Sequence, residues 1–163
     1  MKYSKEQLVW IFLRLALGWM LLWAFFDKLF GLGFSTMHEK SWLNGVSPTL
    51  GFLKGATAGP FASFYQSMAG NPVVDWLFML GLLLISLALI FGIGMRIAGY
   101  SGALLMLLMW TAHLPPQNNP FLDEHLIYMV LFLAFTFVKA GQWFGLGKWW
   151  SQTALVKKFP ILE

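Results

Sequence analysis

Five ionisable side chains lie at the ends of long apolar runs, where they could transfer protons. Asp123, Glu124 and His125 are consecutive, while Lys28 and His113 end two other runs. Ionisable groups beside hydrocarbon are costly and by default mark a site or a pathway. A histidine next to carboxylates can take up and release protons near neutral pH. We therefore take Lys28, His113, Asp123, Glu124 and His125 as the candidate catalytic residues.

A second group of side chains could bind a cofactor. Arg14 stands about a turn and a half inside an apolar run, deeper than a surface anchor requires. Trp23 and Trp110 lie nearer the interior of such runs, and Tyr128 shares a helix face with Glu124 at i, i+4. Arg14, Trp23, Trp110 and Tyr128 are the candidate cofactor-binding residues. The alternatives are a lipid headgroup or a group of backbone carbonyls for Arg14, and simple packing for the tryptophans.

The composition restricts the chemistry of the cofactor. The chain has no cysteine, and its three histidines lack the paired spacing of a metal site, so we expect no metal. Redox chemistry would therefore depend on another bound cofactor. Proton transfer by the candidate catalytic residues is what reduction of a quinone would require, and Trp23 and Trp110 could line an apolar ligand slot.

The elements that must position these residues are membrane-spanning helices. Apolar residues make up 58% of the 163 residues and charged residues 11%, whereas soluble domains carry about 25% charge. The apolar runs approach the roughly 20 residues that a helix needs to cross a bilayer, and lipid requires helices because it cannot satisfy exposed backbone groups. The predicted spans are 8–29, 73–91, 97–114 and 125–138. We expect one all-α domain over 1–163, a four-transmembrane-helix antiparallel bundle.

The connections between the spans support this topology. A glycine turn at 92–96 and a short loop at 115–124 make the last three spans sequential antiparallel neighbours. The connection at 30–72 contains aromatic residues among glycines and prolines. Its Ser47-Pro48 and Gly59-Pro60 pairs are typical of helix starts. They predict two short interfacial helices in a lid-like first extracytoplasmic loop.

In such a bundle the outer ends of all spans converge. That convergence would bring Asp27 and Asp75 close to the candidate catalytic residues. The alternative is that helix ends simply hold polar groups, with Asp75 and Asp123 as N-terminal caps and Lys28 extended toward the headgroups.

The basic residues predict the orientation in the membrane. They flank apolar runs and form no polar cluster, so we expect no nucleic-acid partner. The positive-inside rule places both termini in the cytoplasm of a multi-pass plasma-membrane protein. The first apolar run is too long for a signal peptide and no cleavage site follows it. Basic residues assigned to the cytoplasmic side are Lys2, Lys5, Arg14, Arg96, Lys139, Lys148, Lys157 and Lys158, and those assigned to the outside are Lys28, Lys40 and Lys54.

Small residues recur at four-residue intervals at Gly94, Ala98 and Gly102. Such a stripe lets another helix approach closely. The partner helix could belong to the same chain or to a second copy in a homo-oligomer.

Four segments resemble the DoxX family of small four-span membrane proteins, which includes the DoxD-like subunit of thiosulfate:quinone oxidoreductase. They are RLALGWMLLWAFFDKL at 14–29, GIGMR at 92–96, NPFLDEHLIY at 119–128 and AGQWFGLGKWW at 140–150. The chain departs from many relatives at Gln142 and Gly147, where they carry arginine and aspartate. The resemblance implies transfer of electrons from thiosulfate to a membrane quinone, giving tetrathionate and quinol. Lys28 with His113 or His125 would then supply the positive charge for the small sulfur anion.

Three functions remain open at this point. The first is a quinone-linked membrane oxidoreductase, or its membrane subunit, with the lipid bilayer, a quinone, a sulfur anion and a possible second subunit as partners. The second is a non-enzymatic membrane anchor or assembly partner of another complex. The third is a small lipid or solute transporter, which spans without a broken helix support poorly.

Overall fold

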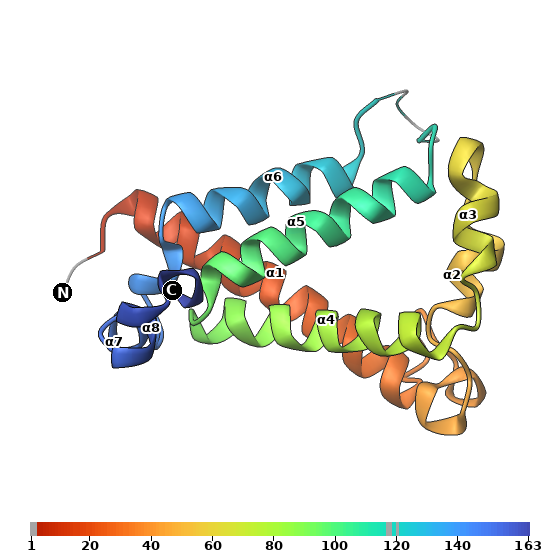
Figure 1. The fold of residues 1–163 in the computed structure, drawn as a ribbon, viewed down its shortest axis with the longest axis horizontal. Coiled ribbons are helices and arrows are strands. Elements are labelled where there is room, and N and C mark those ends of the chain that lie inside the picture. The colour runs from red at the N-terminus through yellow and green to blue at the C-terminus, as the bar shows by residue number, and fades with distance from the viewer. Residues whose placement is uncertain (1–2, 117–118, 120) are drawn as a thin grey trace.

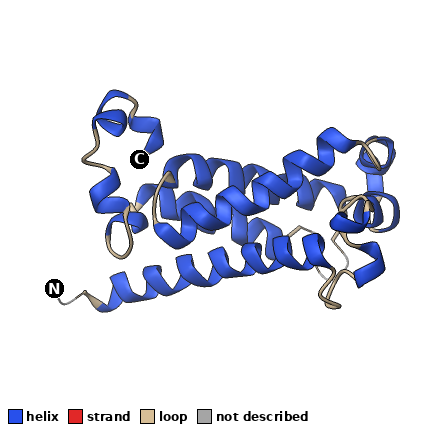
Figure 2. Ribbon diagram, turned by 90° about the horizontal axis from the view of Figure 1, so that it is seen from below, coloured by secondary structure: helices blue, strands red, loops and turns tan. Residues whose placement is uncertain are grey.

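A computed structural model describes residues 3–116, 119 and 121–163, and these residues form helices joined by short connections (Figure 2). Within those ranges there is no strand, and one isolated bridge pairs Ala58 with His113. The all-α prediction is confirmed for this part of the chain. Position 2, counted among the cytoplasmic basic residues, and positions 117, 118 and 120 of the predicted loop at 115–124 lie outside the described residues.

Four helices dominate the structure. They are α1 (Lys5–Phe30), α4 (Pro72–Phe91), α5 (Met95–Ala112) and α6 (Glu124–Phe137). Each end lies within three residues of the end of a predicted span. Among the described residues, α1, α4 and α5 are long and apolar enough to cross a membrane, while α6 is apolar but has only 14 residues. Helices of this length and apolarity are those of a membrane protein.

Local sequence explains where the long helices begin and end. Ser4 caps α1 through a capping box, and Asn71 caps α4 ahead of a proline in its first turn. Gly31 and Gly92 end these helices in the left-handed conformation, with φ of 66° and 74°. Gly94, with φ of 63°, precedes α5. The predicted glycine turn is thus confirmed, as a connection of three residues between α4 and α5.

The long helices pack in sequence order, α1 along α4, α4 against α5 and α5 against α6. Their facing sides form one apolar core that includes Leu21, Met79, Leu89, Phe132 and Phe135. Both chain ends lie at the same end of the molecule, and α2 (Leu50–Gly55) and α3 (Ala62–Ser67) lie at the opposite end (Figure 1).

Glycines bring α5 and α6 unusually close together. A Cβ on Gly99 would collide with the Thr136 side chain and lie 2.9 Å from the Phe132 carbonyl oxygen, and a Cβ on Gly102 would collide with the Phe132 ring. Ala98 is buried in the core. The small-residue stripe is thus accounted for within the chain at Ala98 and Gly102.

The connection between α1 and α4 contains the two expected short helices. Helix α3 follows a 3-10 turn, η3 (Gly59–Phe61), with Pro60 in its first positions, and α2 begins two residues after Pro48. Two further 3-10 turns precede them, η1 (His38–Lys40) and η2 (Trp42–Asn44). The C-terminal part consists of η4 (Ala140–Gln142), α7 (Gly147–Trp150), α8 (Ala154–Lys158) and η5 (Pro160–Leu162).

We expect Gly99→Ala to lower the free energy of unfolding by about 1–3 kcal/mol, because the added methyl group would overpack the α5–α6 contact. Thermal unfolding of the purified protein in detergent measures this. Gly81→Ala is the matched control, because Gly81 lies inside α4 and a Cβ there meets no atom within 4 Å. Equal stability of the two variants would contradict the close approach of α5 and α6.

Candidate functional site

Two histidine rings stack where α5 ends and α6 begins. The ring centroids of His113 and His125 are 5.8 Å apart with an interplanar angle of 17°. His113 Nδ1 lies 3.0 Å from the Met109 carbonyl oxygen, which can only accept, so this nitrogen donates. His125 Nδ1 lies 2.9 Å from Asp123 Oδ2. Each ring is therefore oriented through Nδ1, and within the described residues neither Nε2 has a hydrogen-bond partner.

Asp123 has two roles. Its Oδ1 accepts hydrogen bonds from the backbone N–H groups of His125 and Leu126, so it is the N-cap of α6. Its Oδ2 holds the His125 ring. Burial disfavours the carboxylate, but these hydrogen bonds and the nearby imidazole charge outweigh it, so the pKa of Asp123 lies below its usual value. The capping interpretation is confirmed, and the same side chain also orients a histidine.

These residues line a cavity of about 370 Å³, within the range of about 300–1,000 Å³ typical of ligand sites. Its ionisable lining consists of His113, Asp123, Glu124 and His125. The other described residues that line it are Ala56, Ala58, Pro115, Pro116, Asn119 and Leu122. The structure therefore brings four of the five candidate catalytic residues to one hollow, beside the connection that contains α2.

This cluster could also accommodate a cation. One ligand atom from each of Asp123, Glu124 and His125 lies within 4.8 Å of the others. Glu124 is exposed, and Asp123 already makes three hydrogen bonds. Exposed acidic groups at the start of a helix are common in proteins that bind no ion there. The expectation that no metal binds therefore stays a prediction.

Lys28 lies away from the cavity. Its ammonium is 5.9 Å from the centroid of the Phe78 ring, a cation–π distance. The cavity lining that the structure describes contains neither lysine nor arginine. The physical reason is that the paired ends of α1 and α4 lie apart from the end of α5, with α2 and α3 beside them (Figure 1).

The aromatic residues expected to bind a cofactor do not line this cavity either. Trp23 packs edge-on against Phe34 with centroids 5.2 Å apart, Trp110 Nε1 donates to the Phe121 carbonyl, and Tyr128 packs on the main core. None of the three tryptophan and tyrosine candidates lines the cavity within the described residues. Packing accounts for Trp23 and Tyr128, and the hydrogen bond to the Phe121 carbonyl accounts for Trp110.

Two buried acids fasten the connection between α1 and α4. Asp27 accepts hydrogen bonds from the backbone N–H groups of Phe34 and Ser35 and from the Ser35 hydroxyl. Asp75 accepts from the hydroxyls of Ser47 and Thr49. Charge-assisted hydrogen bonds of this kind can offset the burial of a carboxylate.

The acids expected to converge at the outer helix ends therefore have two roles. Asp123 and Glu124 line the cavity, whereas Asp27 and Asp75 hold the connection between α1 and α4. The interpretation of Asp75 as a helix cap is wrong, because Asn71 caps α4.

Arg14 is fully buried at the opposite end of the bundle. Its Nη1 donates to the Leu89 carbonyl at 2.7 Å and its Nη2 to the Phe144 carbonyl. The Leu89 carbonyl lies in the last turn of α4, where no backbone donor follows at i+4 within the helix. The partial negative charge of that helix end compensates a guanidinium that makes no ion pair within the described residues. Among the interpretations of Arg14, the group of backbone carbonyls is the one observed.

Sequence reasoning missed a second polar cluster near Arg14. The carboxylate of Glu163 accepts from Arg96, Lys139 and Gln142, which lie 67, 24 and 21 residues away in the sequence. Glu163 is distant from any motif. The only signal was indirect, since Arg96 and Gln142 belong to two of the quoted motifs.

Comparison with known proteins finds no relative. The chain matches no family model, no curated protein and no solved structure.

We expect Arg14→Lys to lower the free energy of unfolding by about 1–3 kcal/mol, because one ammonium cannot replace the forked guanidinium and leaves a buried carbonyl unpaired. Chemical or thermal unfolding in detergent measures it. Arg96→Lys is the matched control, because that arginine is partly exposed and a lysine keeps its charge. A loss in the control as large as in Arg14→Lys would refute the role given to the buried carbonyl contacts.

Proposed function

We propose that the chain is a quinone-linked membrane oxidoreductase, or the membrane subunit of one, and that the histidine cavity is where the quinone headgroup binds. The observation that carries this proposal is the stacked pair His113 and His125 in a cavity of about 370 Å³, with Asp123 orienting one ring. Reduction of a quinone consumes two electrons and two protons, so its site needs proton donors beside an apolar volume.

The arrangement supports proton delivery to a bound headgroup. Asp123 fixes Nδ1 of His125, which leaves Nε2 as the atom that can exchange a proton with a bound headgroup. His113, stacked on His125, offers a second imidazole at the same cavity. Glu124 lines the cavity and is exposed, so it can pass protons between water and the histidines.

The geometry favours the quinone half of the reaction over the sulfur half. In the reaction that the family resemblance implies, two thiosulfate ions join through a new S–S bond and release two electrons, which with two protons convert quinone to quinol. The described cavity lining has two carboxylates and no lysine or arginine. It suits a neutral headgroup better than a dianion. We therefore assign thiosulfate oxidation to a partner subunit and quinone reduction to this chain.

The membrane arrangement is part of the same proposal. We propose that α6 provides a fourth crossing and completes an antiparallel four-helix bundle. At 1.5 Å per residue its 14 residues span about 21 Å, so the exposed apolar side chains of Phe121 and Leu122 would extend the apolar length. An even number of crossings agrees with both termini lying at one end of the molecule (Figure 1). The excess of basic residues at that end favours the cytoplasmic side of the plasma membrane.

We expect purified protein in lipid nanodiscs to bind a ubiquinone or menaquinone analogue, measured by quenching of tryptophan fluorescence. With its electron-donating partner present, His125→Gln and His113→Gln should each lower the rate of quinone reduction by about a hundredfold, because each removes a proton donor. His38→Gln is the matched control, because His38 lies in the connection between α1 and α4 and not at the cavity. Absence of quinone binding by the wild-type protein would favour the anchor function instead.

A reporter fused after Glu163 should report a cytoplasmic location, and one inserted beside Lys40 an external location. Alkaline phosphatase and green fluorescent protein fusions distinguish the two sides. The opposite pattern would place the histidine cavity on the cytoplasmic side, and both reporters on the same side would rule out four crossings.

A further inference from the structure

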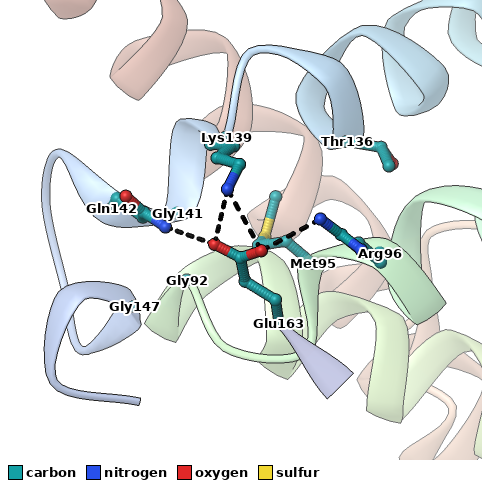
Figure 3. Close-up of a pocket in the computed structure, with 9 residues that line it drawn as sticks. All are labelled: Gly92, Met95, Arg96, Thr136, Lys139, Gly141, Gln142, Gly147 and Glu163. Atoms are coloured by element: carbon teal, nitrogen blue, oxygen red, sulfur yellow. Dashed lines mark hydrogen bonds and ion pairs between the residues drawn. The ribbon is translucent and has the colours of Figure 1, made fainter. Parts of the chain in front are cut away.

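The chain carries a second polar cluster, at the end of the bundle opposite the histidine cavity. Figure 3 shows Arg96, Lys139 and Gln142 pointing toward the carboxylate of Glu163 from three directions. Arg96 Nη2 lies 3.1 Å from Oε2, and Lys139 Nζ lies 3.0 and 3.2 Å from the two oxygens. Gln142 Nε2 donates to Oε1. These three donors, which we call the anion cradle, hold both oxygens of one carboxylate.

The cradle is built by elements that do not include the tail. Arg96 lies in the first turn of α5, Lys139 follows α6, and Gln142 ends η4. Lys139 has φ of 51°, a left-handed conformation that costs a residue with a Cβ and that commonly occurs at functional positions.

Close backbone packing makes the floor of the cradle rigid. A Cβ on Gly141 would collide with the Gly92 carbonyl oxygen, and a Cβ on Gly147 with the carbonyl oxygens of Gly92 and Gly141. The backbone next to Lys139 and Gln142 is therefore held in place by packing that does not involve Glu163.

The Glu163 side chain is 19% exposed, and two of the side chains that bind it are open to water. The side chain of Arg96 is 36% exposed and that of Lys139 51% exposed, and ion pairs open to water contribute little. Besides these contacts, the Arg96 N–H donates to the Glu163 carbonyl and Trp150 Nε1 donates to the Leu162 carbonyl. Val156 of α8 is buried, so α8 has a contact with the rest of the fold that does not involve Glu163.

We propose that the anion cradle is a binding site for an anionic phosphodiester, and that Glu163 occupies it as an internal competitor. A phosphodiester carries one negative charge on two terminal oxygens, as the Glu163 carboxylate does, so it can accept from the same three donors. Ile97, which follows Arg96 in the sequence, and Phe137, two residues before Lys139, are exposed and apolar, which suits a ligand with acyl chains. Headgroups of anionic phospholipids present this chemistry at the ends of membrane-spanning helices, and a soluble phosphodiester shares it.

The absence of cysteine allows a direct test with one spin label. Ile161 is exposed in η5, so Ile161→Cys gives a single labelled site that reports whether the tail is docked. The label is compared in nanodiscs of phosphatidylcholine alone and of phosphatidylcholine mixed with phosphatidylglycerol, at constant ionic strength. A third arm adds dimethyl phosphate to the phosphatidylcholine nanodiscs. We expect phosphatidylglycerol to raise the mobile fraction of the label, and Glu163→Gln to raise it in phosphatidylcholine alone.

Lipid retention gives a second readout that does not depend on the label. Phosphatidylglycerol that remains bound after purification is quantified by mass spectrometry. Glu163→Gln removes the competitor and should increase retention about fivefold, and Arg96→Gln with Lys139→Gln should decrease it about fivefold. The matched control is Lys157→Gln with Lys158→Gln, which removes the same charge from α8 and should leave retention unchanged. If the double cradle variant does not fold, Lys139→Gln alone provides the test.

The outcomes separate the possible sources of the ligand. Release of the tail by phosphatidylglycerol alone identifies a lipid, and release by dimethyl phosphate as well identifies the phosphodiester group itself. Release by neither, or equal lipid retention in the cradle variant and in the α8 control, overturns the proposal. Quinone binding is measured separately, so the outcome of this test does not depend on the function proposed for the histidine cavity.

Discussion

The guanidinium of Arg14 is a positive charge buried in an apolar helix, and the end of the molecule where the two termini lie is organised around it. Neither lipid nor the apolar core can solvate such a charge, so it requires oxygen atoms held in place by the fold. Leu89 and Phe144 supply them from the end of α4 and from the segment before α7. Gly92 is needed at this point because a Cβ there would collide with the guanidinium and with Gly141. One charged side chain thus joins three distant segments, and the anion cradle is built on the same glycine packing.

At the opposite end, polar groups serve the fold and the candidate site separately. Asp27 and Asp75 are buried and use their charge to hold the connection between α1 and α4. This connection in turn packs on the end of α5, where Tyr65 meets Thr111 and the Ala58 N–H donates to the Ala112 carbonyl. The candidate site is left with Asp123, whose carboxylate caps α6 and orients His125. Gly99 and Gly102 allow α5 and α6 to lie close together at Phe132 and Thr136, and the stack of His113 on His125 lies at the end of the same helix pair.

The helices and the local part of the site could be predicted from the sequence. Apolar runs of spanning length fixed the long helices to within a few residues, and glycines marked their ends, because both signals act over a few neighbouring residues. The capping of α6 by Asp123 and its contact with the His125 ring could also be predicted, because these residues are neighbours in the sequence. Lys28 could not be placed this way. Its position depends on how far the α1–α4 pair lies from the end of α5, which side-chain packing along the whole bundle determines.

The sequence by itself therefore determined that this protein is helical, that it is suited to a membrane, and that its ionisable groups gather near the helix ends. The tertiary structure decided which of those groups meet. It paired Arg14 with carbonyls and brought Arg96, Lys139 and Gln142 around Glu163. Such contacts join residues far apart in the chain, and no local periodicity or propensity encodes them. They arise because buried charges and unpaired backbone groups must find partners wherever the packed helices bring them together.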